Sequence, residues 1–439
     1  MSEAYKFTYK TLDDLNSEIS KRSLAIPTTE DSASLARRVK IRGIETSNSL
    51  AVHPMEGFDG TENGAPGELT VRRYERFASG GAGLFWFEAT SVCPEGRSSC
   101  HQLWINDENV DDYKRLVEKM HELSGGAPVI CQLTHSGRFA KPNNTPAPLI
   151  SYHNPIMNER LNLDPSLPVV TDDYLDGLHD KYLHACRLAK EAGFDGVDIK
   201  SCHRYLLSEL LSAYTREGKY GGSYENRTRL LRETVRDAAS VYGADDFIIA
   251  TRMSVSDCIP YPYGFCTTED GQVDLTEAKK LLSELHSSGM SLLNLSMGTP
   301  YYNPHVNRPY DSGGYEPPES PLVGVERMIN ASREIKAAVP ELKVIGTGYS
   351  YLRQFSQNVA AAVLDEGAAD MIGFGRMAFA YPDFAKDMLK NSFDPKKTCL
   401  SCGNCVQLMR RIANAGCPIR DPLYRPIFIE NCGGKPNMF

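Results

Sequence analysis

Short apolar runs alternate along the chain with longer stretches of mixed polarity. The apolar runs predict eight strands, at residues 49–55, 83–89, 129–133, 194–199, 247–253, 292–296, 344–346 and 371–374. Apolar residues recur at helical spacing between most of them, for example at 111–123, 175–192, 226–241, 275–288, 325–338 and 351–365. Strands that alternate with helices in this way predict an α/β fold, a (β/α)8 TIM barrel of parallel strands.

A doubly wound open sheet is the alternative fold with a similar alternation. Such a sheet usually carries a Gly-x-Gly-x-x-Gly turn after its first strand, and its ligands gather in one crevice. The chain has no such turn after residues 49–55, and residues with catalytic potential follow many of the predicted strands. The pattern therefore favours the barrel.

The predicted barrel spans residues 41–395. A polar, weakly helical N-terminal arm, 1–40, precedes it, and a short cysteine-rich extension, 396–439, follows it. Two long polar segments, 139–170 and 301–321, interrupt the alternation after the third and sixth predicted strands. Loops of this length are usually functional, and at the C-terminal ends of barrel strands we expect them to cover an active-site mouth.

Composition and charge narrow the classes of function. The 439 residues are 41% apolar and 24% charged, and the formal net charge is −8. The chain has no run of Lys and Arg residues of the kind that would indicate a nucleic-acid partner. No run of about 18 apolar residues could cross a membrane, and the start of the chain has no apolar leader. We therefore expect a soluble, cytoplasmic protein, with neither nucleic acid nor membrane among its partners.

Three proton-handling side chains follow the strand predicted at 194–199. Lys200, His203 and Tyr205 lie close together in the sequence, at the end of a barrel strand, where catalytic residues are found. The alternative is a strand-to-helix loop whose charged side chains are solvated. Three such residues in so short a stretch favour a catalytic site.

Glycine pairs close the last two predicted strands. Gly346-Thr-Gly348 follows the seventh strand, and Gly373-Phe-Gly375-Arg376 follows the eighth. Glycine lets backbone N–H groups approach an anion and Arg376 adds positive charge, so these turns predict a phosphate site. Tight turns without a ligand are the alternative.

Four cysteines of the extension have the spacing of a thiolate metal site. Two residues separate Cys399 from Cys402 and Cys402 from Cys405, and Cys417 follows after eleven more. In a long chain without a leader, clustered cysteines indicate metal binding or redox chemistry more than disulfides. A [4Fe–4S] cluster, zinc and free thiols are the three alternatives.

Five motifs in order carry a resemblance to a known family. They are Glu88-Ala-Thr, Pro94-Glu-Gly-Arg97, Gln132-Leu-x-His-x-Gly-Arg138, the stretch from Lys200 to Arg227, and Gly373-x-Gly-Arg376. Over nearly the whole predicted barrel, the chain resembles the old yellow enzyme family of FMN-dependent ene-reductases. It resembles most the longer 2-enoate and 2,4-dienoyl-CoA reductases, which carry an iron–sulfur segment after the barrel.

The resemblance implies FMN over the barrel mouth. Arg252 would lie near the N1/C2 carbonyl edge of the flavin and stabilise negative charge there. Gln132 and Ala89 would contact the ring edge, and Gly348, Gly375 and Arg376 would hold the phosphate. The implied FMN-binding residues are Pro54, Met55, Glu56, Ala89, Gln132, Arg252, Gly298, Gly346, Gly348, Gly375 and Arg376. A neighbouring flavin favours a [4Fe–4S] cluster over zinc at the cysteines, since a cluster passes single electrons.

The chain departs from the family pattern at three places. By position, Lys200 and His203 match the pair of residues that binds the substrate carbonyl in the family, and Tyr205 matches the proton donor. The family usually has a histidine at the position of Lys200. A lysine suits a carboxylate or a developing enolate; alternatively it pairs with an acid such as Glu56. Glu56 itself replaces the Cys or Thr of many members. The gap before Cys405 is one residue shorter than usual.

These features predict an oxidoreductase that acts on C=C bonds. Hydride passes from reduced FMN to an alkene conjugated to a carbonyl or carboxylate, Lys200 and His203 polarise the carbonyl, and Tyr205 protonates the α-carbon. One alternative is an amine dehydrogenase of the same fold, with the cation in an aromatic cage supplied by Tyr301, Tyr302 and Tyr310. The other is a non-catalytic electron-transfer subunit. The electron donor is either NAD(P)H or a separate protein. The sequence does not determine the identity of the substrate or whether the chain forms a homo-oligomer.

Overall fold

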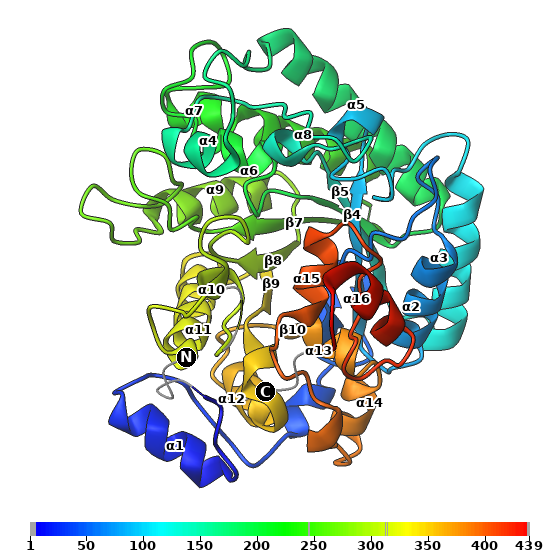
Figure 1. Ribbon diagram of the computed structural model, residues 1–439, viewed down its shortest axis with the longest axis vertical. Coiled ribbons are helices and arrows are strands. Elements are labelled where there is room, and N and C mark those ends of the chain that lie inside the picture. Colours follow the sequence, from blue (N-terminus) through cyan, green and yellow to red (C-terminus); the bar gives the residue numbers. More distant parts are fainter. Residues whose placement is uncertain (1–5, 245, 312, 314, 437–439) are drawn as a thin grey trace.

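Eight parallel strands close into one barrel (Figure 1), which confirms the predicted fold and excludes the open sheet. The computed structural model describes residues 6–244, 246–311, 313 and 315–436. The barrel closes where β10 pairs with both β9 and β3. Its strands are β3 (Leu50–Val52), β4 (Leu84–Ser91), β5 (Val129–Thr134), β6 (Gly196–Ile199), β7 (Ile248–Ser254), β8 (Leu292–Ser296), β9 (Lys343–Gly346) and β10 (Met371–Phe374).

The helices follow the predicted periodicity with two breaks. The stretch 226–241 belongs to α7 (Tyr224–Arg227) and α8 (Arg229–Tyr242), and 351–365 belongs to the 3-10 helix η5 (Tyr349–Phe355) and α12 (Ser356–Asp365). Arg353 has a left-handed φ of 49° inside η5, which prevents a continuous α-helix. The other predicted helices are α3 (Val110–Ser124), α5 (Asp172–Glu191), α9 (Thr276–Ser287) and α11 (Pro321–Ala338).

Shorter helices occupy the connections and both ends of the chain. They are α1 (Leu12–Lys21), η2 (Ala33–Ala36), α2 (Glu68–Ala78), η3 (Pro94–Gly96), η4 (Gly137–Phe139), α4 (Pro155–Leu161), α6 (Leu206–Leu210), α10 (Pro304–Asn307), α13 (Arg376–Ala380), α14 (Phe384–Leu389), η6 (Pro395–Lys397), α15 (Asn404–Arg410) and α16 (Tyr424–Cys432). Of these, α4 and α10 lie in the two long segments after β5 and β8.

A β-hairpin seals the N-terminal end of the barrel. Its strands are β1 (Lys40–Ile41) and β2 (Ile44–Glu45). Ile41 joins a buried cluster with Trp86 and Ile248 from the barrel interior. Burial of this apolar surface stabilises the closed end, and the opposite end, where the strands finish, is left for a functional site.

The C-terminal extension packs against the barrel near α2. The N–H of Ala415 donates to the carbonyl oxygen of Gly57 at 2.7 Å. The carboxylate of Asp421 accepts from both terminal nitrogens of Arg72 at 2.8 and 3.1 Å, and it is only 2% exposed. Such a shielded, bidentate pair is stronger than an exposed one. The segment between helices α15 and α16, which are orange and red in Figure 1, is therefore fixed to the barrel wall.

Candidate active site

A cavity of about 770 Å³ opens among the C-terminal ends of the strands. It is lined by Pro54, Met55, Glu56, Gln132, Lys200, His203, Tyr205, Arg252, Gly348, Gly375 and Arg376, all of which the sequence indicates. Ala89, Gly298 and Gly346 are not part of this lining as far as the structure describes it. The two long segments contribute Phe139 and Tyr301 to its walls, as expected of loops that cover a mouth.

Lys200 and Tyr205 face each other inside the cavity. Nζ of Lys200 lies 4.0 Å from the centroid of the Tyr205 ring, and the two residues are 3% and 2% exposed. Burial raises the pKa of Tyr205 well above its usual range, so the phenol keeps its proton at neutral pH. Its hydroxyl lies 3.4 Å from that of Tyr301, whose ring stacks on Phe139 with 3.6 Å between centroids.

His203 completes the predicted catalytic group as a neutral side chain. Burial, followed by the positive charges of Arg252 and Lys200, holds the pKa of His203 well below its usual range. Its Nε2 lies 3.3 Å from Oγ of Ser296. A neutral imidazole can donate one hydrogen bond but adds no charge, so Lys200 is the charged member of this pair.

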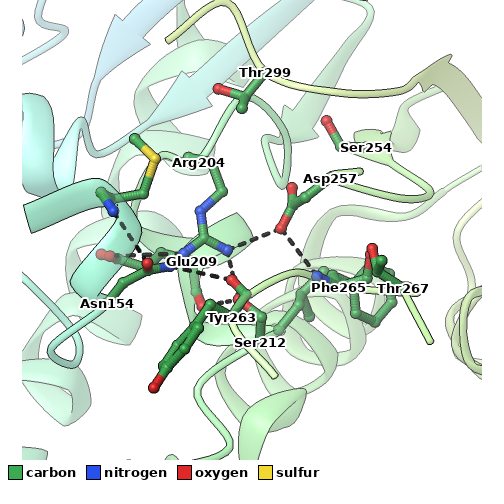
Figure 2. Close-up of polar contacts among 12 residues, drawn as sticks. Asn154, Arg204, Glu209, Ser212, Ser254, Asp257, Tyr263, Phe265, Thr267 and Thr299 are labelled. Atoms are coloured by element: carbon green, nitrogen blue, oxygen red, sulfur yellow. Dashed lines mark hydrogen bonds and ion pairs between the residues drawn. The ribbon is translucent and has the colours of Figure 1, made fainter. Parts of the chain in front are cut away.

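The backbone that carries these residues is strained. His203 and Arg204 both adopt left-handed conformations, with φ of 64° and 63°, which cost about 1–2 kcal/mol per residue outside glycine. Arg204 holds them in place because its guanidinium donates to Asp257 at 2.8 Å (Figure 2) and to the Tyr152 hydroxyl at 3.0 Å. The strain is therefore stabilised directly beside Tyr205.

Arg204 belongs to a fully buried network of four charged side chains. Glu209 on α6 pairs with Arg138 and lies 3.9 Å from Arg204, and all four side chains, including Asp257, are 0% exposed. Burial raises the pKa of Asp257, against the opposing effect of Arg204. Because Arg138, Arg204 and Asp257 follow β5, β6 and β7, the network joins three loops of the cavity rim.

Glu56 lies near Lys200 in the cavity wall. Burial raises its pKa, while the Lys200 ammonium and a 3.1 Å hydrogen bond from Gln102 lower it. In the parts of the chain that the structure describes, no carboxylate oxygen forms a salt bridge within 4.0 Å of the Lys200 ammonium. The ammonium is thus available to a ligand, although Glu56 moderates its field.

Unpartnered polar atoms on the cavity floor fit a flavin ring. Nε of Arg252 and Nε2 of His53 are buried and make no hydrogen bond with any described residue. The backbone N–H of Arg252 donates to Asp198 at 2.6 Å, which fixes the residue, but its guanidinium has no carboxylate partner there. A buried cation without a partner is unfavourable, and the polar, anionic edge of a reduced flavin would satisfy it.

Asp198 is a site residue that the sequence reasoning did not identify. It is fully buried in β6 and accepts from the Gln132 amide at 2.6 Å and from the Trp86 indole at 2.8 Å. Burial raises the pKa of Asp198 to about 6. These contacts orient Gln132 toward the cavity from behind. An acid within an apolar strand run is the sequence signal for such a residue.

The glycines that follow the last two barrel strands are required for different physical reasons. Gly348 has a left-handed φ of 101° at the start of η5, which other residues rarely adopt. Gly373 is required by packing, because a Cβ there would lie 2.1 Å from the His53 ring. Gly348, Gly375 and Arg376 all line the large cavity. That they hold a phosphate stays a prediction.

Four of the five cysteines of the extension line a second, small cavity. Cys399, Cys402, Cys405 and Cys417 all line this space of about 20 Å³. Cys405 and Arg376 line both this cavity and the large one. Across the described residues, however, no group of three or more His, Cys, Asp or Glu side chains is arranged to hold a metal ion. The four thiols therefore lie around one space, as their spacing in the sequence predicts. A metal bound there remains a proposal.

The charge of the large cavity is opposite to that of the whole chain. Its cationic residues are Arg138, Lys141, Arg160, Lys200, Arg252, Arg308, Arg376 and Arg410, and Glu56 is the acid among the described lining residues. The chain itself has a formal net charge of −8. A cationic cleft in an acidic protein concentrates anions, so the cavity is suited to anionic ligands.

The family is shown by a match over residues 37–393 to the NADH:flavin oxidoreductase / NADH oxidase family. The chain belongs to this family, which confirms the resemblance read from the motifs. It is 26% identical over 374 residues to an NADH oxidase of Thermoanaerobacter brockii, covering 84% of this chain and 52% of that protein. It is also 26% identical over 370 residues to an NADPH dehydrogenase of Halalkalibacterium halodurans, covering 83% and 94%.

Solved structures share the fold. A 2-naphthoyl-CoA reductase superposes with a TM-score of 0.74 at 19% identity, over 91% of this chain and 58% of the other. A histamine dehydrogenase from Rhizobium sp. 4-9 superposes with a TM-score of 0.68 at 20% identity, over 91% and 53%. The chain therefore spans about half the length of several relatives. In its described part, no helix is both long and apolar enough to pass through a bilayer.

Proposed function

We propose that the protein is an FMN-dependent ene-reductase that acts on alkenes conjugated to a carbonyl or carboxylate. The observation that carries the proposal is the enclosure of Lys200, His203 and Tyr205 in one cavity with the unpaired guanidinium of Arg252. FMN, when bound, supplies the hydride. The residue contacts in the cavity support roles for the chain's own groups in binding and proton transfer.

Each polar residue has a distinct task in this proposal. Lys200 and His203 bind the carbonyl or carboxylate oxygen and stabilise the negative charge that develops there. Tyr205, buried and protonated, donates a proton to the α-carbon. Arg252 holds the polar edge of the flavin, and Gln132, oriented by Asp198, contacts the same ring. Phe139 and Tyr301, one from each long segment, would help to exclude water.

We further propose that residues 41–395 bind FMN, that residues 396–439 hold a [4Fe–4S] cluster and that 1–40 form an arm. The cluster would use Cys399, Cys402, Cys405 and Cys417, which share one cavity beside the flavin pocket. The electron donor is NAD(P)H, as the names of the relatives suggest, or a separate protein that acts through the cluster.

Anaerobically purified protein is expected to show flavin absorption bands with a broad iron–sulfur shoulder. Heat should release FMN and no FAD, and acid should release iron and sulfide in amounts that match one cluster. Cys402→Ala should lose the iron, whereas Cys432→Ala should keep it, because Cys432 lies outside the cysteine cavity. A colourless protein would refute the flavin function, and stoichiometric zinc would refute the cluster.

Lys200→Met is expected to weaken the binding of an enoate by about 10- to 100-fold, because a hydrogen bond to a charged group contributes about 1.5–3 kcal/mol. A matched neutral enone should lose less, since only the carboxylate forms a charge-assisted bond. Dissociation constants of both compounds are measured by titrating the flavin spectrum. Lys141→Met, in the outer wall of the same cavity, is the control. If the two compounds lose equal affinity, Lys200 does not bind the carboxylate.

The structure disfavours the amine dehydrogenase alternative. Of the three tyrosines expected to form an aromatic cage, Tyr301 lines the cavity, whereas Tyr302 and Tyr310 are not among its described lining residues. The Lys200 ammonium also lies 4.0 Å from the Tyr205 ring centroid, where a substrate cation would be repelled. A histamine dehydrogenase shares the fold, but this cavity is suited to anions.

A further inference from the structure

Three arginines from three separate segments line the large cavity, and one of them borders the cysteine cavity as well. Arg308 follows α10, Arg376 begins α13 and Arg410 ends α15, and all three line the large cavity. Arg376 also lines the cysteine cavity. Arg410 lies outside the residues that match the family, 37–393, so it belongs to the extension and is not one of the family motifs.

None of the three guanidinium groups has an acidic partner within the described chain. Arg376 donates one hydrogen bond, to the carbonyl oxygen of Pro309 at 3.1 Å. Other arginines of the chain do pair with carboxylates, as Arg72 does with Asp421. Three like charges that converge without a counter-ion are unfavourable unless an anion joins them.

Arg308 lies within the electrostatic influence of the other two arginines. Burial, followed by the charges of Arg376 and Arg410, lowers the pKa of Arg308 to about 10. Arg308 is still cationic at neutral pH. A ligand with two negative charges would relieve the repulsion, and a phosphate monoester carries about that charge. Guanidinium groups bind phosphate oxygens through paired hydrogen bonds, so their chemistry fits this ligand better than a single carboxylate.

We propose that Arg308, Arg376 and Arg410 form one binding site for the FMN phosphate, and that Arg410 brings the C-terminal extension to the flavin. This inference rests on the proposed flavin function and deepens it. The backbone turns at Gly348 and Gly375 lie in the same wall and complete the site with N–H groups. The extension thus contributes to flavin binding as well as to the cysteine cavity.

The test compares two flavins that differ only in the phosphate. The full-length chain is freed of flavin and titrated with FMN and with riboflavin, and binding is followed by flavin fluorescence. Arg410→Gln is expected to weaken FMN on the order of tenfold and to leave riboflavin unchanged. Arg410→Lys should recover part of the loss. Arg411→Gln is the matched control, because Arg411 is the next residue and lies outside the described cavity lining.

The outcomes separate the inference from the proposed function. Unchanged FMN affinity in Arg410→Gln would overturn the inference, and so would an equal loss for FMN and riboflavin, which indicates a general disturbance of the extension. A loss in Arg411→Gln as large as in Arg410→Gln would overturn it too. If the parent binds neither flavin, the proposed function itself fails. All these readouts are binding measurements and do not depend on the substrate.

Discussion

Tyr205→Phe is expected to slow the reaction of reduced flavin with an alkene by about 10²–10⁴-fold, the contribution of a general acid. The phenol is the natural donor because it is buried, keeps its proton at neutral pH and lies against the Lys200 ammonium. Phenylalanine keeps the ring and its packing. Reduction of the flavin by NAD(P)H does not use this proton, so its rate should change little.

The two half-reactions are measured separately by anaerobic stopped-flow spectroscopy. Tyr301→Phe is the matched control, since its hydroxyl lies 3.4 Å from that of Tyr205 in the same cavity. It should slow alkene reduction far less. If Tyr301→Phe has the larger effect, the proton donor is Tyr301. If Tyr205→Phe slows flavin reduction instead, the role assigned to Tyr205 is wrong.

Asp257→Ala is expected to lower the free energy of unfolding by about 3–5 kcal/mol, as for other buried ion pairs that lose one partner. Its removal leaves Arg204 without its 2.8 Å partner, and both side chains are 0% exposed. Glu209 lies 3.9 Å from Arg204 but also pairs with Arg138, so it compensates only in part. The left-handed backbone of His203 and Arg204 loses its anchor, so alkene reduction should slow as well.

Unfolding in denaturant measures the loss of stability. The control is Asp365→Ala, the same substitution in an exposed pair with Arg37, where the side chains are 57% and 43% exposed. Exposed pairs contribute about 0–1 kcal/mol. A loss at Asp257 no larger than at Asp365 would show that the network around Arg204 does not stabilise the rim.

The fold was predictable because each barrel strand is buried on both sides. A fully buried strand leaves a short, continuous apolar run such as 371–374, which the structure reproduces as β10. Helix boundaries were less predictable where a local backbone choice interrupts a periodic stretch. Thr228 and Arg353 show this, since the apolar spacing continues across both breaks.

The candidate site was predictable as a place, but the role of each motif residue was not. Arg97 and Arg138 both belong to motifs of the family, yet Arg97 donates to backbone carbonyl oxygens such as that of Gln102, and Arg138 pairs with buried Glu209. They shape the rim and contact no reacting group in the proposed mechanism. A sequence motif records that a residue type is needed, without saying whether a ligand or a loop needs it.

The border shared by the two cavities makes their contents thermodynamically reciprocal. Cys405 and Arg376 each face both spaces, so whatever fills one space changes the energy of filling the other. Any factor by which an occupied cysteine cavity tightens the flavin must equal the factor by which the flavin tightens the occupant of the cysteine cavity. Under the proposed function, a favourable coupling would make FMN and the proposed cluster promote the binding of each other to the same degree.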